Sequence, residues 1–228
     1  MKKTLVVDIG GTHVKLMMRG KKQRQFDSGP RMRPKDFVAR LRTTTGGWTF
    51  ENISIGFPAP IRDGEIIGNP KHLGKGWLGF NFRKSLGKPV RVINDAAMQA
   101  LGSYNSGRML FLGLGTGLGS ALLLESMLFP LELGDLPYRH HEIIEKFLGI
   151  PGIKRLGVKK WKREVIFAVT QLKKSFIADY VVLGGGNVHR FKRLPPKVKR
   201  GKNEHAFLGG LRLWQKNPRT GKPKWRIM

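Results

Sequence analysis

Asp8 and the glycines after it are the first residues in the chain that could do chemistry. The sequence reads Asp8-Ile9-Gly10-Gly11-Thr12-His13-Val14-Lys15 at this point. Two glycines let the backbone turn tightly and bring its N–H groups close to a phosphate. Asp8 could hold Mg²⁺ directly or through water, while Thr12 offers a hydroxyl and Lys15 a positive charge. The turn alone is weak evidence for a phosphate site, because an ordinary glycine hairpin has the same composition.

A second glycine-rich turn lies in the second half of the chain, at Gly113-Leu114-Gly115-Thr116-Gly117-Leu118-Gly119. It also stands between two apolar runs, so both turns are typical of β-hairpins. No helix pattern follows it and it lacks a GK[ST] sequence, which argues against a Rossmann fingerprint and a Walker loop. The turn therefore favours a second phosphate clamp. Gly184-Gly185-Gly186, after the apolar run YVVL, favours a third close approach, against which a nucleotide could lie.

Asn94 and Asp95 stand where an apolar run changes into an alanine-rich helical pattern. A carboxylate at such a strand-to-helix junction can accept the proton of a hydroxyl during phosphoryl transfer. Asp and Asn are also common helix N-caps, and the two residues alone leave both interpretations open. Together, the two phosphate turns and the aspartate between them predict a phosphotransferase.

These residues need strands and helices to position them. Apolar runs predict strands at 4–9, 14–19, 22–27 and 51–57, before residue 94, on both sides of the second turn, and at 178–183. Helical spacing predicts helices at 34–44, 95–104, 138–149, 161–176 and 203–216, the last capped by Asn203. Residues 62–89 are expected to form an irregular binding loop, and residues 217–228 to be loosely ordered. The repeated hairpin predicts two domains, 1–105 and 106–228, with the last helix returning to the first domain.

Composition limits the classes of function. The chain has 228 residues and no Cys, so disulfides and thiolate zinc sites are excluded and a reducing cytoplasm is expected. Its apolar runs are too short or too interrupted for a signal peptide or a membrane span. Lys and Arg number 43 against 15 Asp and Glu, for a net charge of +28. Such a charge attracts nucleic acid, polyphosphate or an acidic surface, but a solvated basic surface without a partner is equally consistent with it.

The motifs then combine into a resemblance. The segments DIGGTHVKL, INDAAMQALG, GLGTGLGSALLLE, LELGD and VVLGGGNV occur in the order seen in the ROK family of sugar kinases and repressors. The chain resembles this family from about residue 4 to about residue 214, and IGFPAPIRDGEI…GNPKHLGKGWLGFNF resembles its polyphosphate/ATP-dependent glucokinase branch. The resemblance implies an α/β, two-domain actin-like/hexokinase fold (RNase H-like) with mixed sheets and a cleft. It also implies phosphoryl transfer from polyphosphate or ATP to the 6-hydroxyl of glucose or a related hexose, with Mg²⁺, and suggests a homodimer.

The resemblance implies a role for each matching residue. Asp95 would be the general base. The phosphate-binding residues would be Asp8, Gly10, Gly11, Thr12, Lys15, Gly115, Thr116 and Gly117. The residues beside the adenosine would be Gly184, Gly185 and Gly186. The sugar-binding residues would be Asn69, Asn94, Asp95, Glu132 and Asp135.

Two departures from the family concern the sugar. Asp135 stands where the family has the histidine of ELGH, which replaces a donor-capable group by an acceptor, so mannose, fructose or an amino sugar remain alternatives to glucose. The family's zinc cysteines are missing, so no zinc is expected. His140 and His141 would face opposite directions on a helix and make a poor metal site. A repressor reading is disfavoured, because the first phosphate turn begins at Asp8 and leaves no room for a DNA-binding domain before it.

A hypothesis of another class remains open: a catalytically weak protein of this fold that binds nucleic acid or another polyanion. Its support is the charge, the altered ELGD motif and the aromatic residues among the basic ones, which base stacking would require. These aromatic residues are Trp161, Phe191, Trp214 and Trp225. Under the kinase hypothesis, the basic stretches 154–163 and 189–202 are instead expected to flank the donor cleft and guide polyphosphate.

Overall fold

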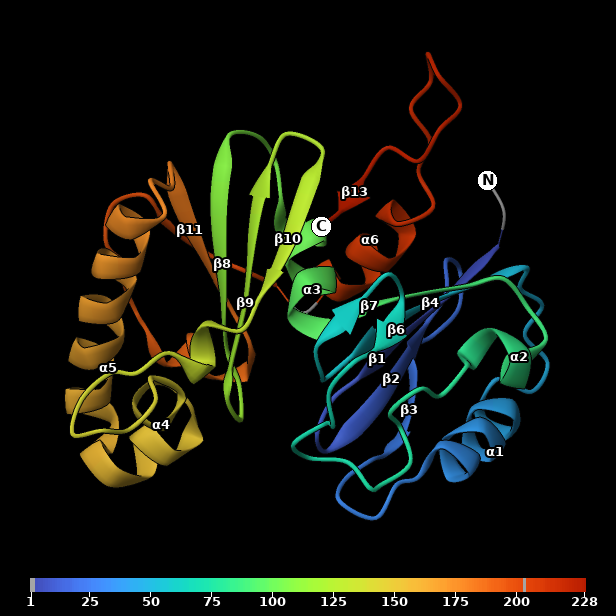
Figure 1. The fold of residues 1–228 in the computed structure, drawn as a ribbon, viewed down its shortest axis with the longest axis horizontal. Coiled ribbons are helices and arrows are strands. Elements are labelled where there is room, and N and C mark those ends of the chain that lie inside the picture. The colour runs from blue at the N-terminus through green and yellow to red at the C-terminus, as the bar shows by residue number, and fades with distance from the viewer. Residues whose placement is uncertain (1–2, 203) are drawn as a thin grey trace.

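The apolar runs of the sequence form two large β-sheets in the computed structural model, which describes residues 3–202 and 204–228 (Figure 1). The first sheet builds the N lobe, with strand order β3-β2-β1-β4-β7. Its strands are β1 (Thr4–Ile9), β2 (His13–Met17), β3 (Arg24–Asp27), β4 (Asn52–Phe57) and β7 (Val90–Asn94). Strands β1, β4 and β7 are parallel, so their carboxyl ends meet at one edge of the sheet.

The second large sheet builds the C lobe, with strand order β12-β11-β8-β9-β10-β13. Strands β8, β9 and β10 form an antiparallel meander, whereas β11 is parallel to β8. The strands are β8 (Arg108–Leu114), β9 (Leu118–Leu124), β10 (Met127–Leu131), β11 (Tyr180–Gly184), β12 (Val198–Arg200) and β13 (Arg226–Ile227). Each lobe thus has a mixed sheet, and each predicted glycine turn joins two antiparallel strands.

Aromatic side chains form part of the core of the N lobe. Helix α1 (Pro34–Thr44) has the predicted bounds, with Pro34 in its first turn and Phe37 buried. Phe37 lies edge-on to both Trp77 and Phe82, with ring centroids 5.8 Å apart in each pair. Trp77 and Phe82 come from the segment expected to be an irregular loop, which in fact also contains β6 (Glu65–Ile66) and α2 (Phe82–Leu86), while β5 (Ile61–Arg62) pairs with β6. Buried aromatic rings therefore fix this segment to the lobe.

The helices of the C lobe differ from the prediction. Residues 138–144 are not helical, and His140 and His141 have φ values of 52° and 58°, so they lie in a turn and not on a helix. Helix α4 is short (Glu145–Leu148), and α5 (Ile150–Ser175) begins at Ile150, not at residue 161. Gly157, with φ 69° and ψ 158°, is not helical and divides α5 into two segments at a kink, the second of which contains residues 161–175 of the predicted helix.

Two helices join the lobes: α3 (Asp95–Ser103) and α6 (Glu204–Arg212), which lie side by side between the sheets in Figure 1. A Cβ on Gly102 would overlap the carbonyl oxygen of His205, and one on Gly209 that of Met98. Only glycine permits this close crossing. Helix α6 also contacts the N lobe, since Ser54 Oγ donates to Gly210 O at 2.6 Å.

Helix α6 ends at Arg212, earlier than the expected residue 216. Asn203, the expected cap, lies outside the described residues. The domain ranges 1–105 and 106–228 stay a prediction.

The expectation of a loose C-terminus is wrong. Strand β13 pairs with β10, which adds the chain's end to the C-lobe sheet. Trp225 stacks edge-on against Tyr104 at 5.8 Å and donates from Nε1 to Gln215 Oε1 at 3.1 Å. The many Lys and Arg residues of this segment mask the contribution of Trp225 in the sequence pattern. In the described part of the chain, no helix is long and apolar enough to cross a membrane.

Candidate active site between the two lobes

Asp8 and Asp95 come together at the edge where the parallel strands end. Asp8 is the last residue but one of β1 and pairs with Gly56 of β4, and Asp95 follows β7, the strand on the other side of β4. A Cβ on Gly56 would lie 2.5 Å from Met98 Cε and 3.2 Å from Asp95 Cα. Gly56 therefore lets α3 begin close above β4, with Asp95 near Asp8. The sequence patterns did not single out Gly56, because its role depends on this close contact.

The two aspartates have raised pKa values. Burial, together with the negative charges of Asp8 and Glu132, raises the pKa of Asp95 to about 7. The backbone N–H of Ala96 donates to Asp95 Oδ1 at 2.8 Å and opposes the rise. Burial also raises the pKa of Asp8 to about 6, against the nearby charge of Lys15. A carboxyl group with a pKa near neutrality is suited to proton transfer.

The structure separates the two interpretations of Asn94 and Asp95. Asn94 is the N-cap of α3: its side-chain oxygen accepts from Ala97 N at 3.1 Å, and its Nδ2 donates to Ala59 O at 3.3 Å. Asp95 is the first residue of the helix, so Asn94 and not Asp95 is its N-cap. The sugar contact predicted for Asn94 stays a prediction.

The first glycine turn uses one amide for itself and leaves the next two open. Gly10 N donates to His13 O at 2.9 Å, which closes the turn. Ser28 braces it, since its Oγ donates to Gly10 O at 2.6 Å and its N–H to Thr12 O at 2.9 Å. Among the described residues, no acceptor faces the N–H of Gly11 or Thr12. These amides are available to an anion, and phosphate binding by this turn stays a prediction.

The second glycine turn has the same design. Gly115 N donates within the turn, to Gly113 O at 3.1 Å and Gly117 O at 3.2 Å. The N–H groups of Thr116 and Gly117 have no acceptor within residues 3–202 and 204–228. A Cβ on Gly119 would lie 2.5 Å from Ala96 Cβ, so this hairpin packs directly on the start of α3. Asp95 therefore lies close to both turns.

The third glycine stretch packs against the strand that leads into the second turn. Gly185 has φ 79°, and a Cβ there would lie 2.6 Å from the backbone of Leu114, at the end of β8. Asn187, in the short 3-10 helix η2 (Gly186–Arg190), donates from Nδ2 to Gly115 O at 3.2 Å. Glycines 184–186 and the second turn thus form one continuous wall.

Carboxylates of the C lobe gather next to the second glycine turn, where Glu145 Oε2 accepts from Leu118 N at 3.3 Å. Glu132 precedes and Asp135 ends the 3-10 helix η1 (Leu133–Asp135), and Glu145 begins α4. Burial and the charges of Asp135 and Glu145 raise the pKa of Glu132, against the charge of Lys71. Lys71 Nζ lies 2.8 Å from Asp135 Oδ1 and 3.5 Å from Glu145 Oε2.

Sequence reasoning missed Lys71 and Glu145. Lys71 stands in a loop with several other basic residues, and nothing local distinguishes it from them. Asn69, predicted to bind the sugar, is exposed in the same loop.

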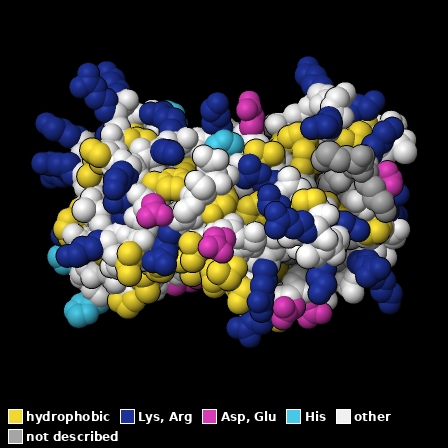
Figure 2. All heavy atoms as spheres, turned by 90° about the horizontal axis from the view of Figure 1, so that it is seen from above, with side chains coloured by type: hydrophobic (Ala, Val, Ile, Leu, Met, Phe, Trp, Pro, Cys, Tyr) yellow, Lys and Arg dark blue, Asp and Glu magenta, His cyan; other side chains and the backbone are white. Residues whose placement is uncertain are grey.

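The aromatic residues offered for base stacking are mostly unavailable. Trp161 is fully buried, Phe191 is 2% exposed, and their rings pack together at 5.3 Å in the core of the C lobe. Trp214 lies under the guanidinium of Arg91 at 4.5 Å, and Trp225 packs on Tyr104. Because these rings are buried or packed against other side chains, they do not support a nucleic-acid site. Lys and Arg side chains spread over both lobes of the face in Figure 2 and do not form one stripe.

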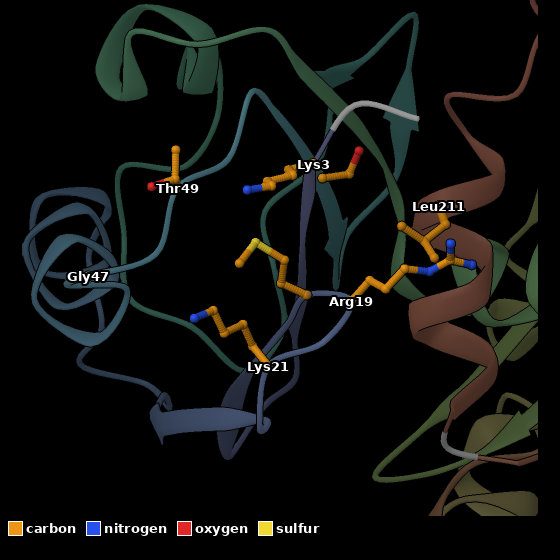
Figure 3. Close-up of a pocket in the computed structure, with 8 residues that line it drawn as sticks. Lys3, Arg19, Lys21, Gly47, Thr49 and Leu211 are labelled. Atoms are coloured by element: carbon orange, nitrogen blue, oxygen red, sulfur yellow. The ribbon is translucent and has the colours of Figure 1, made fainter.

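A separate cavity of about 400 Å³ lies on the N lobe, away from both turns (Figure 3). Lys3 and Lys21 point toward the loop with Gly47 and Thr49, whereas Arg19 points toward Leu211 on α6. None of the predicted site residues lines this cavity. The candidate site around Asp8, Asp95 and the two glycine turns therefore lies elsewhere in the structure.

Two lobes with mixed sheets, each carrying a glycine-rich hairpin, define an actin-like α/β fold. The inorganic polyphosphate/ATP-glucomannokinase from Arthrobacter sp. strain KM superposes with a TM-score of 0.79 at 21% identity, covering 92% of this chain and 97% of that one. A ROK-family glucokinase from Streptomyces griseus, solved with glucose and AMPPNP, gives 0.73 at 15% identity, covering 91% and 97%. This protein has the fold of the ROK family of sugar kinases.

Sequence comparison points the same way over a shorter stretch. The polyphosphate glucokinase of Mycobacterium tuberculosis (strain H37Rv) is 26% identical over 150 residues, 59% of this chain. The matched region spans 56% of that relative, about half of its length. No protein-family profile matches the sequence.

Proposed function

We propose that this protein is a cytoplasmic sugar kinase that transfers a phosphoryl group from polyphosphate or ATP to the 6-hydroxyl of glucose or a related hexose. The observation that carries the proposal is the position of Asp95, with a pKa of about 7, beside Asp8 and against the second glycine turn. The names of its relatives support the same reaction class, because they include a polyphosphate glucokinase and a polyphosphate/ATP-glucomannokinase.

The open amides of the two turns would bind the phosphates of the donor, with Lys15 adding positive charge. Asp95 would accept the proton of the sugar hydroxyl as its oxygen bonds to the terminal phosphorus. The bond from that phosphorus to its bridging oxygen breaks, which leaves ADP or a polyphosphate shorter by one unit. The proton ends on Asp95 and passes to solvent.

Asp8 would hold Mg²⁺. Within the described ranges, no group of three or more His, Asp or Glu could form a metal site from protein alone. Mg²⁺, however, is commonly held by one or two carboxylates together with substrate phosphates and water. Asp8 lies one residue before the end of β1, next to the first turn, and fits this arrangement. When bound, the ion would neutralise charge on the transferred group.

The charge distribution supports an anionic donor. The site's acidic residues sit within a protein of net charge +28, so its outer surface is more basic than its cleft. Long-range attraction of this kind raises the association rate of a polyanion and weakens in salt. Polyphosphate, with many charges, should gain more from it than ATP. Glycines 184–186 would lie beside the adenosine when ATP is the donor.

A donor and acceptor panel tests the proposal. The full chain is assayed with glucose, mannose, fructose and glucosamine, each with ATP and with polyphosphate, by detection of the sugar phosphate. We expect a hexose 6-phosphate, with polyphosphate use falling more steeply than ATP use as salt rises. No transfer from either donor to any sugar, together with tight nucleic-acid binding at physiological salt, would support the binding-protein alternative instead.

A further inference from the structure

Lys71 forms ion pairs that join the two lobes. It belongs to the N-lobe loop between β6 and α2, and its partners Asp135 and Glu145 belong to the C lobe. The other ion pairs between described residues stay within a single lobe: His13–Asp27, Arg139–Glu164 and Arg155–Glu142. In the described structure, Lys71 therefore forms the charged link from one wall of the cleft to the other.

The loop that carries Lys71 is held in place by the residues that directly follow it. Gly74 N donates to Met32 O at 3.0 Å, and Trp77 Nε1 donates to the same oxygen at 3.2 Å. His72 packs on the first glycine turn, because a Cβ on Gly11 would lie 3.1 Å from His72 Cβ. Lys71 is thus placed by a fixed backbone and is coupled through its neighbour to the donor side of the site.

The carboxylates near Lys71 cannot donate a hydrogen bond to the hydroxyls of a bound sugar. Ionised Glu132, Asp135 and Glu145 only accept hydrogen bonds, whereas each hydroxyl of a sugar both donates and accepts. An ammonium carries three N–H donors, and two carboxylates occupy at most part of them. The Lys71 side chain is 50% exposed, so the remaining donor capacity faces open space.

The acidic partners of Lys71 favour the charged form of its side chain. Burial alone would lower the pKa of Lys71, but the hydrogen bond to Asp135 and the charges of Glu145 and Asp135 raise it above its ordinary value. The ammonium therefore stays protonated at neutral pH and remains a donor. Asp135 replaces the histidine of the family's ELGH motif. Its carboxylate forms an ion pair with Lys71, whereas a histidine would not attract this ammonium.

We propose that Lys71, anchored by Asp135, is a specificity-determining residue that donates a hydrogen bond to a hydroxyl of the acceptor sugar. The inference rests on the proposed kinase function. The lysine from one lobe and the carboxylates from the other would hold the sugar between them. A neutral, hydroxyl-rich acceptor fits this wall, because its hydroxyls can donate to the carboxylates and accept from the ammonium.

The test compares Lys71→Met with Lys71→Arg and with Lys75→Met, a matched change at an exposed lysine of the same loop. Lys71→Met should raise the KM for the sugar by about tenfold or more, the usual effect of losing a hydrogen bond to a charged group. The kcat and the donor KM should change less than about threefold, since those depend on Asp95 and the turns. Lys71→Arg should restore part of the affinity, and Lys75→Met should behave as wild type.

Deoxy sugars distinguish a direct contact from a structural role. Sugars lacking one hydroxyl at a time should bind the wild type unequally, with the largest loss for the hydroxyl that Lys71 contacts. In Lys71→Met that particular loss should disappear, whereas a lysine that only holds the lobes together would weaken all sugars equally. Thermal melting of each variant checks that the fold is kept.

The outcomes separate the two proposals. Transfer by the wild type, with the same sugar KM and the same deoxy-sugar pattern in Lys71→Met, overturns this inference alone. A wild type that neither phosphorylates nor binds any sugar overturns the proposed function and this inference with it.

Discussion

The donor side of the proposed site consists of backbone amides, whereas its acceptor side consists of side chains. On the donor side, two hairpins with the same hydrogen-bond design present backbone amides, and each hairpin is held by its own strand ladder. On the acceptor side, side chains from three separate segments meet, and one of them crosses between the lobes. The donor side should therefore be sensitive to any added Cβ at a contact, and the acceptor side to the identity of single side chains.

The largest effect is expected where the two sides meet, at Asp95. Asp95→Asn removes the base but keeps the size and the neighbouring Asn94 cap, so kcat should fall by about 10²–10⁴-fold with both KM values nearly unchanged. Steady-state kinetics with each donor measure this. Asp63→Asn is the matched control, because Asp63 is exposed in a turn with φ 53°, which Asn tolerates. Full activity of Asp95→Asn would contradict the mechanism.

The donor side is broken by a side chain at Gly119. Gly119→Val should push the second hairpin away from Ala96, where even a Cβ would lie 2.5 Å from the Ala96 Cβ. Overpacking of this kind costs about 1–3 kcal/mol of folding stability. Because the displaced turn would no longer hold the donor in place, kcat/KM for the donor should fall by roughly 10- to 100-fold. Sugar binding in the absence of donor should change little. An equal loss of sugar binding would show that the two sides are not independent.

The smallest effect is the pH dependence, which sharpens the role of Asp95. Because its pKa is raised to about 7, kcat/KM should be flat above that pH and fall about tenfold for each pH unit below it. The sign for stability is opposite. The folded protein holds this proton more tightly than the unfolded chain, so that stabilisation is present below the ordinary pKa of 3.8 and is lost as pH rises to about 7. Thermal melting of Asp95→Asn above pH 7 should therefore exceed that of wild type, and a lower value would count against a buried, destabilised carboxylate.

The parts of the molecule that the sequence predicts well are those set by local pattern. Glycines between apolar runs predicted both hairpins, and helical spacing after a proline predicted α1 with its bounds. Asp95 followed from the change of pattern at the end of β7. The roles of these residues in binding phosphate and sugar stay predictions, as does the homodimer.

Contacts between distant segments could not be predicted in the same way. Lys71 and Asp135 are 64 residues apart and meet only because the lobes face each other. Gly56, Gly102 and Gly209 matter through what packs on them, which no local pattern encodes. The kink at Gly157 and the anchor at Trp225 depend likewise on tertiary packing, which outweighs local propensity.

The position of α6 makes the cores of the two lobes depend on each other. Val6 is fully buried, and a Cβ on Gly210 would overlap its side chain, while the carbonyl of Gly210 accepts the hydroxyl of Ser54. This face of the first lobe is covered by α6, a helix that follows strands β8 to β12 of the second lobe in the sequence. The chain then turns back to place β13 in the second lobe. Segments from both halves of the sequence thus complete the first lobe, so we expect the two lobes to unfold as one cooperative unit.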